Sequence, residues 1–269
     1  MKKIFLTILL LSVIKMTTAQ SLFKIGLTYT IGKEQSLLGK KKDTQHEKNV
    51  NSSFGAGLTI DVGYVYLDNH NFGPEGTFSF FLGKPKTTQH SASANSDSKT
   101  VVHRKMLFFS SALFVIGKNN SDINPYLSSG LLFNLWQNVT KTEYAENNNG
   151  EKTEKIWKVN YNRGIGYKSK IGVLHNTTDD FALFAEVQYQ MISISYKNEL
   201  LNNYTVNSKD LLSTLNLSER ERVYYPELTH DSNTQSNSNF DINKATAINL
   251  KYANHNHFGA SIGGFLISQ

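Results

Sequence analysis

The chain has 269 residues, of which 39% are hydrophobic, 12% are aromatic and none is cysteine. The absence of cysteine excludes disulfide frameworks, thiol catalysis, cysteine-ligated zinc and iron–sulfur clusters. The formal net charge is +6 at pH 7, and no apolar run beyond the first twenty residues approaches the roughly 18 residues that a membrane-spanning helix requires.

The N-terminal residues predict an export signal. Lys2 and Lys3 precede an apolar run at 4–14, and small residues follow up to Ala19. This order of basic, apolar and small residues is typical of a secretory signal peptide, and a run of about eleven apolar residues is too short to span a bilayer. We therefore predict that residues 1–19 form a signal peptide that is cleaved after export.

The exported part of the chain, residues 20–269, is predicted to be one domain with little net charge. Without the three lysines of the signal, it has 25 basic and 22 acidic residues. Such a small excess does not indicate nucleic-acid binding, and an exported chain without cysteine suits a bacterial envelope. The sequence therefore predicts no nucleic-acid partner and a bacterial destination.

Apolar and polar residues alternate along most of this domain. In the first example Phe23, Ile25 and Leu27 alternate with Lys24 and Gly26. Successive side chains of a β-strand point to opposite faces, so a period of two predicts a strand with one apolar face. The same pattern predicts strands at 54–66, 77–83, 127–135, 157–173, 181–191 and 258–263, and 104–116 is strand-like but apolar on both faces.

The connections between these strands are alternately short and long. Short turns are expected at 68–76, 118–124 and 176–180, and long polar segments at 33–52, 84–100, 141–154 and 198–241. Outer-membrane barrels combine tight periplasmic turns with long external loops and an even strand number. A soluble sandwich or lipocalin also alternates along its strands, but it does not account for the regular difference between the two sets of connections.

We therefore predict an all-β fold, a transmembrane antiparallel up-and-down β-barrel. Eight strands are expected if 242–252 and 257–268 form one long, bulged strand. Ten strands remain the alternative if a further strand lies within 198–241. Tyr and Trp near the strand ends are expected to form interfacial girdles, namely Tyr29, Tyr64, Tyr66, Tyr126, Trp136, Trp157, Tyr161 and Tyr189.

Several charged residues occupy the face opposite the apolar one and are predicted to point into the lumen. They are Lys24, Asp61, Lys158, Lys168, Lys170 and Glu186. The interior of an eight-stranded barrel is only wide enough to be filled by side chains. We expect these lysines and carboxylates to pair and close the lumen, and a narrow ion-selective path is the functional alternative.

One hairpin resembles a known family. The strand 166–173 (GYKSKIGV), the tight turn 176–180 (NTTDD) and the strand 181–189 (FALFAEVQY) are similar to the penultimate hairpin of the small outer-membrane β-barrel proteins common in Bacteroidota (the outer membrane protein beta-barrel domain). The long segment after this hairpin also fits. The resemblance implies the fold and a location in the bacterial outer membrane, and it implies no chemistry.

The sequence predicts no catalytic residue, no cofactor and no metal site. The eight histidines are scattered, and the most suggestive group is His255 and His257 with Ser261. Two histidines without a third ligand or a carboxylate form a weak metal or base signal, and none of the common nucleotide or zinc motifs is present.

The predicted function is therefore non-enzymatic, an envelope structural or surface-binding role exerted through the long external loops. Outer-membrane lipid is the expected partner of the barrel wall, and a surface ligand or protein is the candidate partner of the loops. Three alternatives stay open: a narrow passive transport pore, an envelope hydrolase, and a secreted soluble β-barrel that binds a ligand inside.

Overall fold

The structure, a computed structural model, describes residues 20–35, 37–43, 46–51, 55–68, 71–93, 96–117 and 122–268. The predicted signal peptide, residues 1–19, lies outside these residues and stays a prediction. In the part that is described, no helix is both long and apolar enough to cross a membrane.

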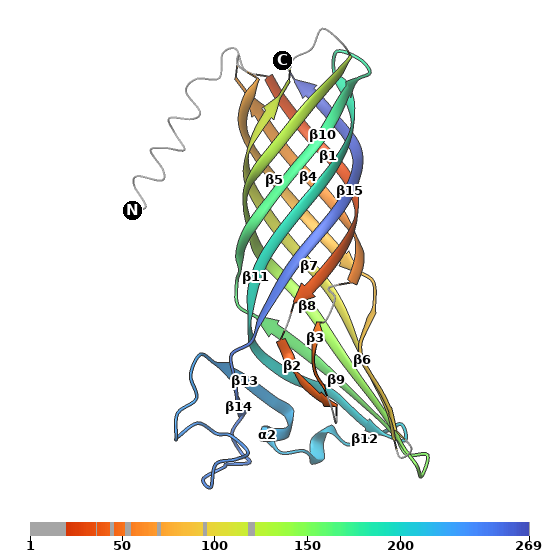
Figure 1. Cartoon of the computed structure of the whole chain (residues 1–269), viewed down its shortest axis with the longest axis vertical. Helices are drawn as coiled ribbons and strands as arrows, with labels where there is room; N and C mark the ends of the chain where they lie inside the picture. The colour runs from red at the N-terminus through yellow and green to blue at the C-terminus, as the bar shows by residue number, and fades with distance from the viewer. Residues whose placement is uncertain are drawn as a thin grey trace.

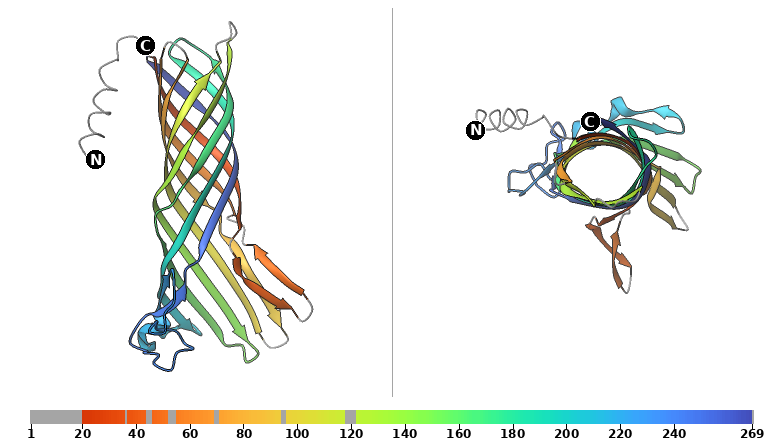
Figure 2. Two further views of the ribbon diagram at one scale, coloured as in Figure 1. Left: turned by 60° about the vertical axis from the view of Figure 1, so that its left-hand side comes forward. Right: turned by 90° about the horizontal axis from the view of Figure 1, so that it is seen from above.

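Eight antiparallel strands form a closed ring in which each strand pairs with its neighbours in the chain and the last pairs with the first (Figures 1 and 2). The ring consists of β1 (Gln20–Gln35), β4 (Gly55–Leu67), β5 (Phe72–Gly83), β7 (Ser96–Ile116), β8 (Ile123–Asn147), β10 (Ile165–Asn176), β11 (Phe181–Val206) and β15 (Tyr252–Ser268). Pairing of β1 with β15 closes the ring, from Ser21 opposite Ser268 to Gln35 opposite Asn254. The prediction of an eight-stranded up-and-down barrel is confirmed.

A further strand, β9 (Lys152–Tyr161), occupies the same position in the ring as β10. Both strands pair with β8 on one side and with β11 on the other, so β9 continues β10 beyond a break at 162–164. A transmembrane strand needs about 9–11 residues, whereas β8 has 25 and β11 has 26. These strands therefore extend well beyond the membrane at one end.

The apolar face of the strands points outward. Large apolar side chains are exposed on every strand of the ring. The most exposed include Phe258, Ile262 and Ile165, each more than 60% exposed. Exposing such a surface to water is unfavourable in free energy, whereas exposing it to hydrocarbon is not. A closed sheet also leaves no unpaired backbone edge inside the bilayer. This outward apolar band marks the membrane-spanning part of the barrel.

The two ends of the barrel differ as the sequence predicts. One end has only the short connections near 68–71, 117–122 and 177–180, and β15 also ends there (Figure 1). We refer to it as the short-turn end, which faces the periplasm in barrels of this kind. The opposite, long-loop end has projecting hairpins that include β2 (Leu37–Asp43), β3 (His46–Asn51) and β6 (Lys86–Ser93).

The connection between β11 and β15 is a small folded unit, which we call the external cap (residues 207–251). It contains β12 (Lys209–Asp210), η1 (Leu212–Thr214), α2 (Leu217–Arg220), β13 (Glu221–Tyr225) and β14 (Thr246–Asn249). The prediction that 242–252 and 257–268 form one long, bulged strand is wrong. β14 leaves the barrel and pairs in parallel with β13, and only β15 closes the ring.

The predicted side-chain phase is also wrong over 157–161. Trp157 and Val159 are buried inside, whereas Ile165 and Tyr167 farther along face outward. All four positions are odd-numbered, so the phase reverses within 162–164. The register against β11 changes there by one residue, from Tyr161 opposite Tyr196 to Ile165 opposite Ser193, because a bulge adds one unpaired residue.

The residues predicted to form the aromatic girdles do not all point outward. Tyr29, Tyr64 and Trp136 are exposed on the outer surface, whereas Tyr126, Trp157 and Tyr161 are buried. Tyr66 and Tyr189 are half-buried. The buried three have side chains directed away from lipid, and they contribute to the interior instead.

Candidate functional site

The middle of the lumen contains a network of three buried ion pairs. Lys24 Nζ lies 2.5 Å from Glu186 Oε2, Lys168 Nζ lies 3.2 Å from Asp61 Oδ1, and Lys170 pairs with Glu75. All six side chains are at most 2% exposed, so each charge is removed from water. Three lysines and three carboxylates balance, and the layer carries no net formal charge.

Hydroxyl groups from the surrounding strands complete this layer. Asp61 accepts hydrogen bonds from Ser79 and from Thr28 Oγ1 at 2.7 Å. Glu75 accepts from Ser128 and from Thr77 Oγ1 at 2.9 Å. A buried charge is tolerated when its remaining lone pairs are hydrogen-bonded, so these small residues keep the carboxylates charged inside the wall.

Aromatic rings close over the Lys24–Glu186 pair. The Tyr126 hydroxyl lies 2.6 Å from Glu186 Oε2, and Lys24 Nζ lies 4.2 Å from the centroid of the Phe184 ring and 5.7 Å from that of Phe265. A cation over an aromatic face is attracted to the ring quadrupole, and the attraction strengthens when both groups are desolvated. The polar layer is therefore continuous with aromatic packing.

Apolar side chains pack on both sides of the ion pairs, and toward the long loops buried polar side chains such as Arg104, Asn134 and Gln190 lie among them. At the short-turn end the lower apolar layer contains Leu22, Val65, Leu67, Phe114, Tyr126, Leu174, Ala182, Phe184 and Phe265. Toward the long loops the upper apolar layer contains Phe81, Val102, Met106, Phe108, Leu132, Val139, Val159, Tyr161, Ile192, Ile194, Tyr196 and Tyr224. The ring looks open in the ribbon view of Figure 2, but side chains occupy this space.

The six predicted lumen residues do not all come together. Lys24, Asp61, Lys168, Lys170 and Glu186 are buried in the ion-pair network. Lys158 is different, because it lies on β9 beyond the break at 162–164 and its side chain is exposed. The prediction for Lys158 assumed an uninterrupted phase from 157 to 173, and the bulge reverses that phase.

Sequence reasoning missed Glu75, which completes the third ion pair. The sequence predicts a turn over 68–76, which includes this residue, whereas β5 begins at Phe72. Glu75 has the same phase as Thr77 and Ser79, which also face the lumen. Extending the period of two by one step toward the N-terminus would have found it.

A second charged cluster, the external clamp, lies at the long-loop end and joins the external cap to the barrel. The Glu199 Oε2 atom lies 2.9 Å from Lys141 Nζ and 3.2 Å from Arg222 Nη1. The Arg222 guanidinium also stacks 4.1 Å from the Trp157 ring centroid, and Trp157 Nε1 donates to Glu143 at 3.0 Å. Arg222 belongs to β13, which pairs directly with β11 at Glu199.

The clamp lies well beyond the outward apolar band, which ends at Met191 on this strand. Burial acts to raise the pKa of the Glu199 carboxyl, but Lys141 and Arg222 outweigh it and hold the pKa below the usual value. Burial, followed by the Glu199 carboxylate, raises the pKa of the Tyr224 hydroxyl. Glu199 is therefore charged and Tyr224 is neutral at physiological pH.

The cap is ordered internally by asparagine side chains. Asn233 Nδ2 donates to the carbonyl oxygens of Asp241, Lys244 and Ala245 at 2.9–3.1 Å, and its Oδ1 accepts from the Asp241 backbone N–H at 2.8 Å. Asn237 Nδ2 donates to the carbonyls of residues 230 and 232. Side chains thus satisfy backbone groups that no sheet or helix pairs.

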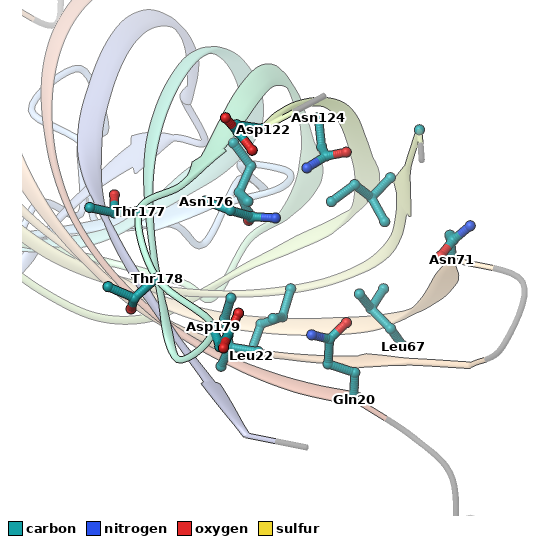
Figure 3. A pocket seen from close by; sticks show the side chains of 14 residues that line it. Gln20, Leu22, Leu67, Asn71, Asp122, Asn124, Asn176, Thr177, Thr178 and Asp179 are labelled. Atoms are coloured by element: carbon teal, nitrogen blue, oxygen red, sulfur yellow. The ribbon is translucent and has the colours of Figure 1, made fainter. Parts of the chain in front are cut away.

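A pocket of about 550 Å³ opens at the short-turn end. Figure 3 shows polar side chains around it, including Gln20, Asn71 and Asp122, together with Leu22 and Leu67. The two leucines belong to the lower apolar layer. The pocket is therefore a vestibule whose inner end meets packed side chains.

The histidine group considered for hydrolysis has a different environment from the one a triad requires. Ser261 Oγ lies 2.6 Å from Thr28 Oγ1 and belongs to the polar layer. The His257 ring packs edge-on against the Phe81 ring, with centroids 5.6 Å apart, and the His255 side chain lies outside the described part. Among the described residues there is no group of three or more His, Asp or Glu that could hold a metal.

Comparison with known proteins supports the fold. No protein-family model and no curated protein sequence matches the chain. The chain is similar in structure to the outer membrane protein OprG from Pseudomonas aeruginosa, with 12% sequence identity, a TM-score of 0.50, and coverage of 94% of this chain and 97% of that chain.

Two other solved structures are less similar. Neisserial surface protein A has 12% identity and a TM-score of 0.37, with 90% of this chain and 95% of that chain covered. Ail of Yersinia pestis, solved with the heparin analogue sucrose octasulfate, has 9% identity and a TM-score of 0.30, with 91% and 98% covered. The likeness to OprG and the outward apolar band together define a bacterial outer-membrane β-barrel fold.

Proposed function

We propose that this chain is a non-enzymatic protein of the bacterial outer membrane, in which a sealed barrel anchors an ordered external surface. The observation that supports this proposal most strongly is the filled lumen, with a neutral ion-pair layer between two apolar layers. Ions crossing such an interior would have to displace packed aromatic rings and break buried salt bridges. Interiors packed in this way contain few voids larger than a water molecule.

The ordered cap supports a surface-binding role. A flexible loop loses conformational entropy when it binds, and a loop that is already folded loses less. The external clamp holds residues 207–251 against the barrel, and the Asn233 hydrogen bonds order this unit internally. We therefore assign contact with a surface ligand or protein partner to the long-loop end.

The alternatives have less support. A passive pore needs an open path, whereas packed side chains occupy the lumen on both sides of the ion pairs. A hydrolase needs an accessible nucleophile, whereas Ser261 is buried inside the barrel wall. A soluble ligand-binding barrel needs its apolar faces inside, whereas here they are exposed. Membership of the small Bacteroidota barrels rests on the resemblance of the hairpin 166–189 and of the long segment after it.

Conductance of reconstituted protein tests the sealed lumen. The folded chain is inserted into a planar lipid bilayer in 1 M KCl, and no steady current steps are expected. A Phe184→Ala/Phe265→Ala variant, which empties part of the lower apolar layer, is the comparison. Stable, uniform current steps from the unaltered chain would refute the sealed barrel and make the pore the leading function.

Cysteine labelling tests the orientation of the cap. The chain has no native cysteine, so Ser238→Cys in the cap and Thr178→Cys in the turn after β10 each provide one reactive thiol. A membrane-impermeant maleimide should label Ser238→Cys on intact cells and Thr178→Cys only after lysis. The reverse pattern would place the cap in the periplasm and exclude a surface role.

A further inference from the structure

Basic side chains gather on the outer wall of the barrel, at the edge of the apolar band nearer the long loops. Four of them form what we call the basic patch: Lys105 on β7, Lys158 on β9, Arg163 between β9 and β10, and Lys197 on β11. All four are exposed. The strands β7, β8, β9 and β11 pair with one another in this order (Figure 1), so the patch occupies one continuous side of the barrel.

The phase of each strand directs the patch lysines outward. Lys105 has the same phase as Leu113 on β7, and Lys197 has the same phase as Met191 on β11, and both of these apolar residues are exposed on the outer face. Lys158 lies between two buried residues of β9. The patch therefore faces the medium around the barrel and not the lumen.

Strand register places the cations around a row of amide side chains. Lys105 lies opposite Asn138 on β8, and Asn160 on β9 lies opposite Asn198 on β11, with 3.0 Å between Asn160 Nδ2 and Asn198 Oδ1. Lys197 falls at the register shift beside Asn198. Three strand spacings separate β7 from β11, so the patch is about 14 Å wide. This width can accommodate a headgroup with several polar groups.

The patch lies at the level of lipid headgroups. Ile165, two residues from Arg163, and Trp136, two residues from Asn138, are exposed apolar residues of the band directly below it. Tryptophan is enriched where the hydrocarbon of a membrane meets water. The four cations therefore follow the last lipid-facing residues, well before the tips of the long hairpins.

The charges of the patch are not neutralised by the protein. The segments that contain it have no Asp or Glu, namely 99–109, 134–142, 158–165 and 191–198. The next carboxylate on β11, that of Glu199, is buried and pairs with Lys141 and Arg222. Within the described part of the chain, none of the four patch side chains forms an ion pair. Exposed cations at this level attract anionic lipid.

We infer that the basic patch binds the phosphate groups of lipid A in the outer leaflet. Lysine and arginine are the side chains that recognise phosphate, and the guanidinium of Arg163 can bind it through two parallel hydrogen bonds. A soluble polyanion would meet the hairpin tips first, whereas the patch adjoins the membrane. The inference rests on the proposed orientation, in which the long-loop end faces outward.

Lipid binding to the unaltered chain tests the role of phosphate. The folded protein in dodecyl maltoside is titrated with bisphosphorylated lipid A, and separately with the same lipid A after both phosphates are removed, and bound lipid is counted by native mass spectrometry. Each basic residue near an anionic headgroup contributes about fivefold in affinity, so the phosphorylated form should bind at least about twentyfold more tightly. Equal binding of the two forms would show acyl-chain contact alone and overturn the proposal.

Two competitors test the identity of the ligand. Phosphatidylglycerol should displace lipid A only in large excess, because its single phosphate contacts fewer of the four cations. Equal competition would indicate general attraction of anionic lipids and overturn the assignment to lipid A. Displacement by a soluble sulfated oligosaccharide at equal concentration would assign the patch to a soluble polyanion instead.

A matched pair of variants tests the residues. Lys158→Gln/Lys197→Gln removes two patch charges and should weaken binding of phosphorylated lipid A about 25-fold, with little effect on the dephosphorylated form. Lys99→Gln/Lys209→Gln removes two exposed lysines nearer the hairpin tips and should leave both affinities within about twofold. A patch variant that shifts on boiling, as a folded barrel does, and loses no more affinity than the control would overturn the assignment. The comparison of the two lipids on the unaltered chain does not depend on these variants.

The cysteine labelling described above tests the orientation separately. Binding in micelles does not depend on orientation, so phosphate-independent binding would count against the patch alone and leave the surface role intact. Labelling that places the cap in the periplasm would put the patch beside the inner leaflet and overturn the assignment to lipid A together with the surface role.

Discussion

Removing one charge from the lumen should destabilise the barrel strongly. Asp61→Asn keeps the shape of the side chain but leaves Lys168 buried without its carboxylate, which lies 3.2 Å away in the unaltered chain. Breaking a buried pair from one side costs about 3–5 kcal/mol because the remaining charge is uncompensated. Lys168 Nζ retains Ser79 Oγ at 3.0 Å, so we expect a loss near the lower end, about 3 kcal/mol.

Reversible urea unfolding in detergent micelles measures this loss, with fluorescence of Trp136 and Trp157 as the signal. A second variant, Asp61→Asn/Lys168→Met, removes both charges and separates the pair from the rest of the network. Residues in direct contact couple by about 0.5–3 kcal/mol, and we expect the double variant to recover about 2 kcal/mol. An Asp61→Asn loss below about 1 kcal/mol, or a double variant less stable than the single one, would show that water solvates these charges and that the lumen is not sealed.

Further predictions follow from the clamp, the wall and the outer face. Glu199→Gln should loosen the cap and raise tryptic cleavage of β13 about tenfold or more, because hydrogen bonds to charged groups contribute about 1.5–3 kcal/mol; the same change at the exposed Glu227 is the control. Because the folded pKa of Glu199 is lowered, its contribution is complete above the ordinary value of 4.5 and is lost as the pH falls through the folded pKa. The protection of β13 amides against exchange, relative to their intrinsic rate at each pH, should therefore fall in acid and stay constant between pH 6 and 8. Gly263→Ala places a Cβ atom 2.1 Å from the Ile25 carbonyl oxygen and should cost at least about 3 kcal/mol in urea unfolding, whereas Gly150→Ala, in an open turn at φ +73°, should cost only about 1–2 kcal/mol. Lys158→Ala should change the free energy of unfolding by less than about 0.5 kcal/mol. A large loss of stability would indicate that Lys158 is buried inside the barrel.

The overall barrel was predictable because its main signal is local. A strand with one face in lipid must alternate, so Phe23, Ile25 and Leu27 indicate both the strand and its outward face before any tertiary contact is known. The lengths of the turns then indicate which ends of the strands are joined directly. Both the alternation and the turn lengths can be read from a single sequence.

The errors arise where the phase depends on a feature that the sequence does not mark. The bulge between Tyr161 and Ile165 adds one unpaired residue, and nothing in Asn162, Arg163 or Gly164 distinguishes it from an ordinary strand segment. A one-residue shift moves every following side chain to the other face. Lys158 and Trp157 were consequently assigned to the wrong sides.

Other features depend on contacts between distant segments. The strand β14 has only four residues and pairs with β13 alone, and the clamp joins Lys141, Glu199 and Arg222 from three separate elements. Neither a spacing nor a motif brings these residues together in the sequence. Glu75 is the exception, since its phase within β5 was readable.

Heat-modifiability tests the central claim most directly. Outer-membrane fractions from cells producing the full chain are extracted with detergent and run on an SDS gel with and without boiling. The account predicts that the protein stays with the membrane until detergent is added and that its band shifts on boiling, because a closed barrel resists SDS until heat opens it. A protein that leaves the membrane without detergent and shows no shift would contradict a membrane-spanning closed barrel.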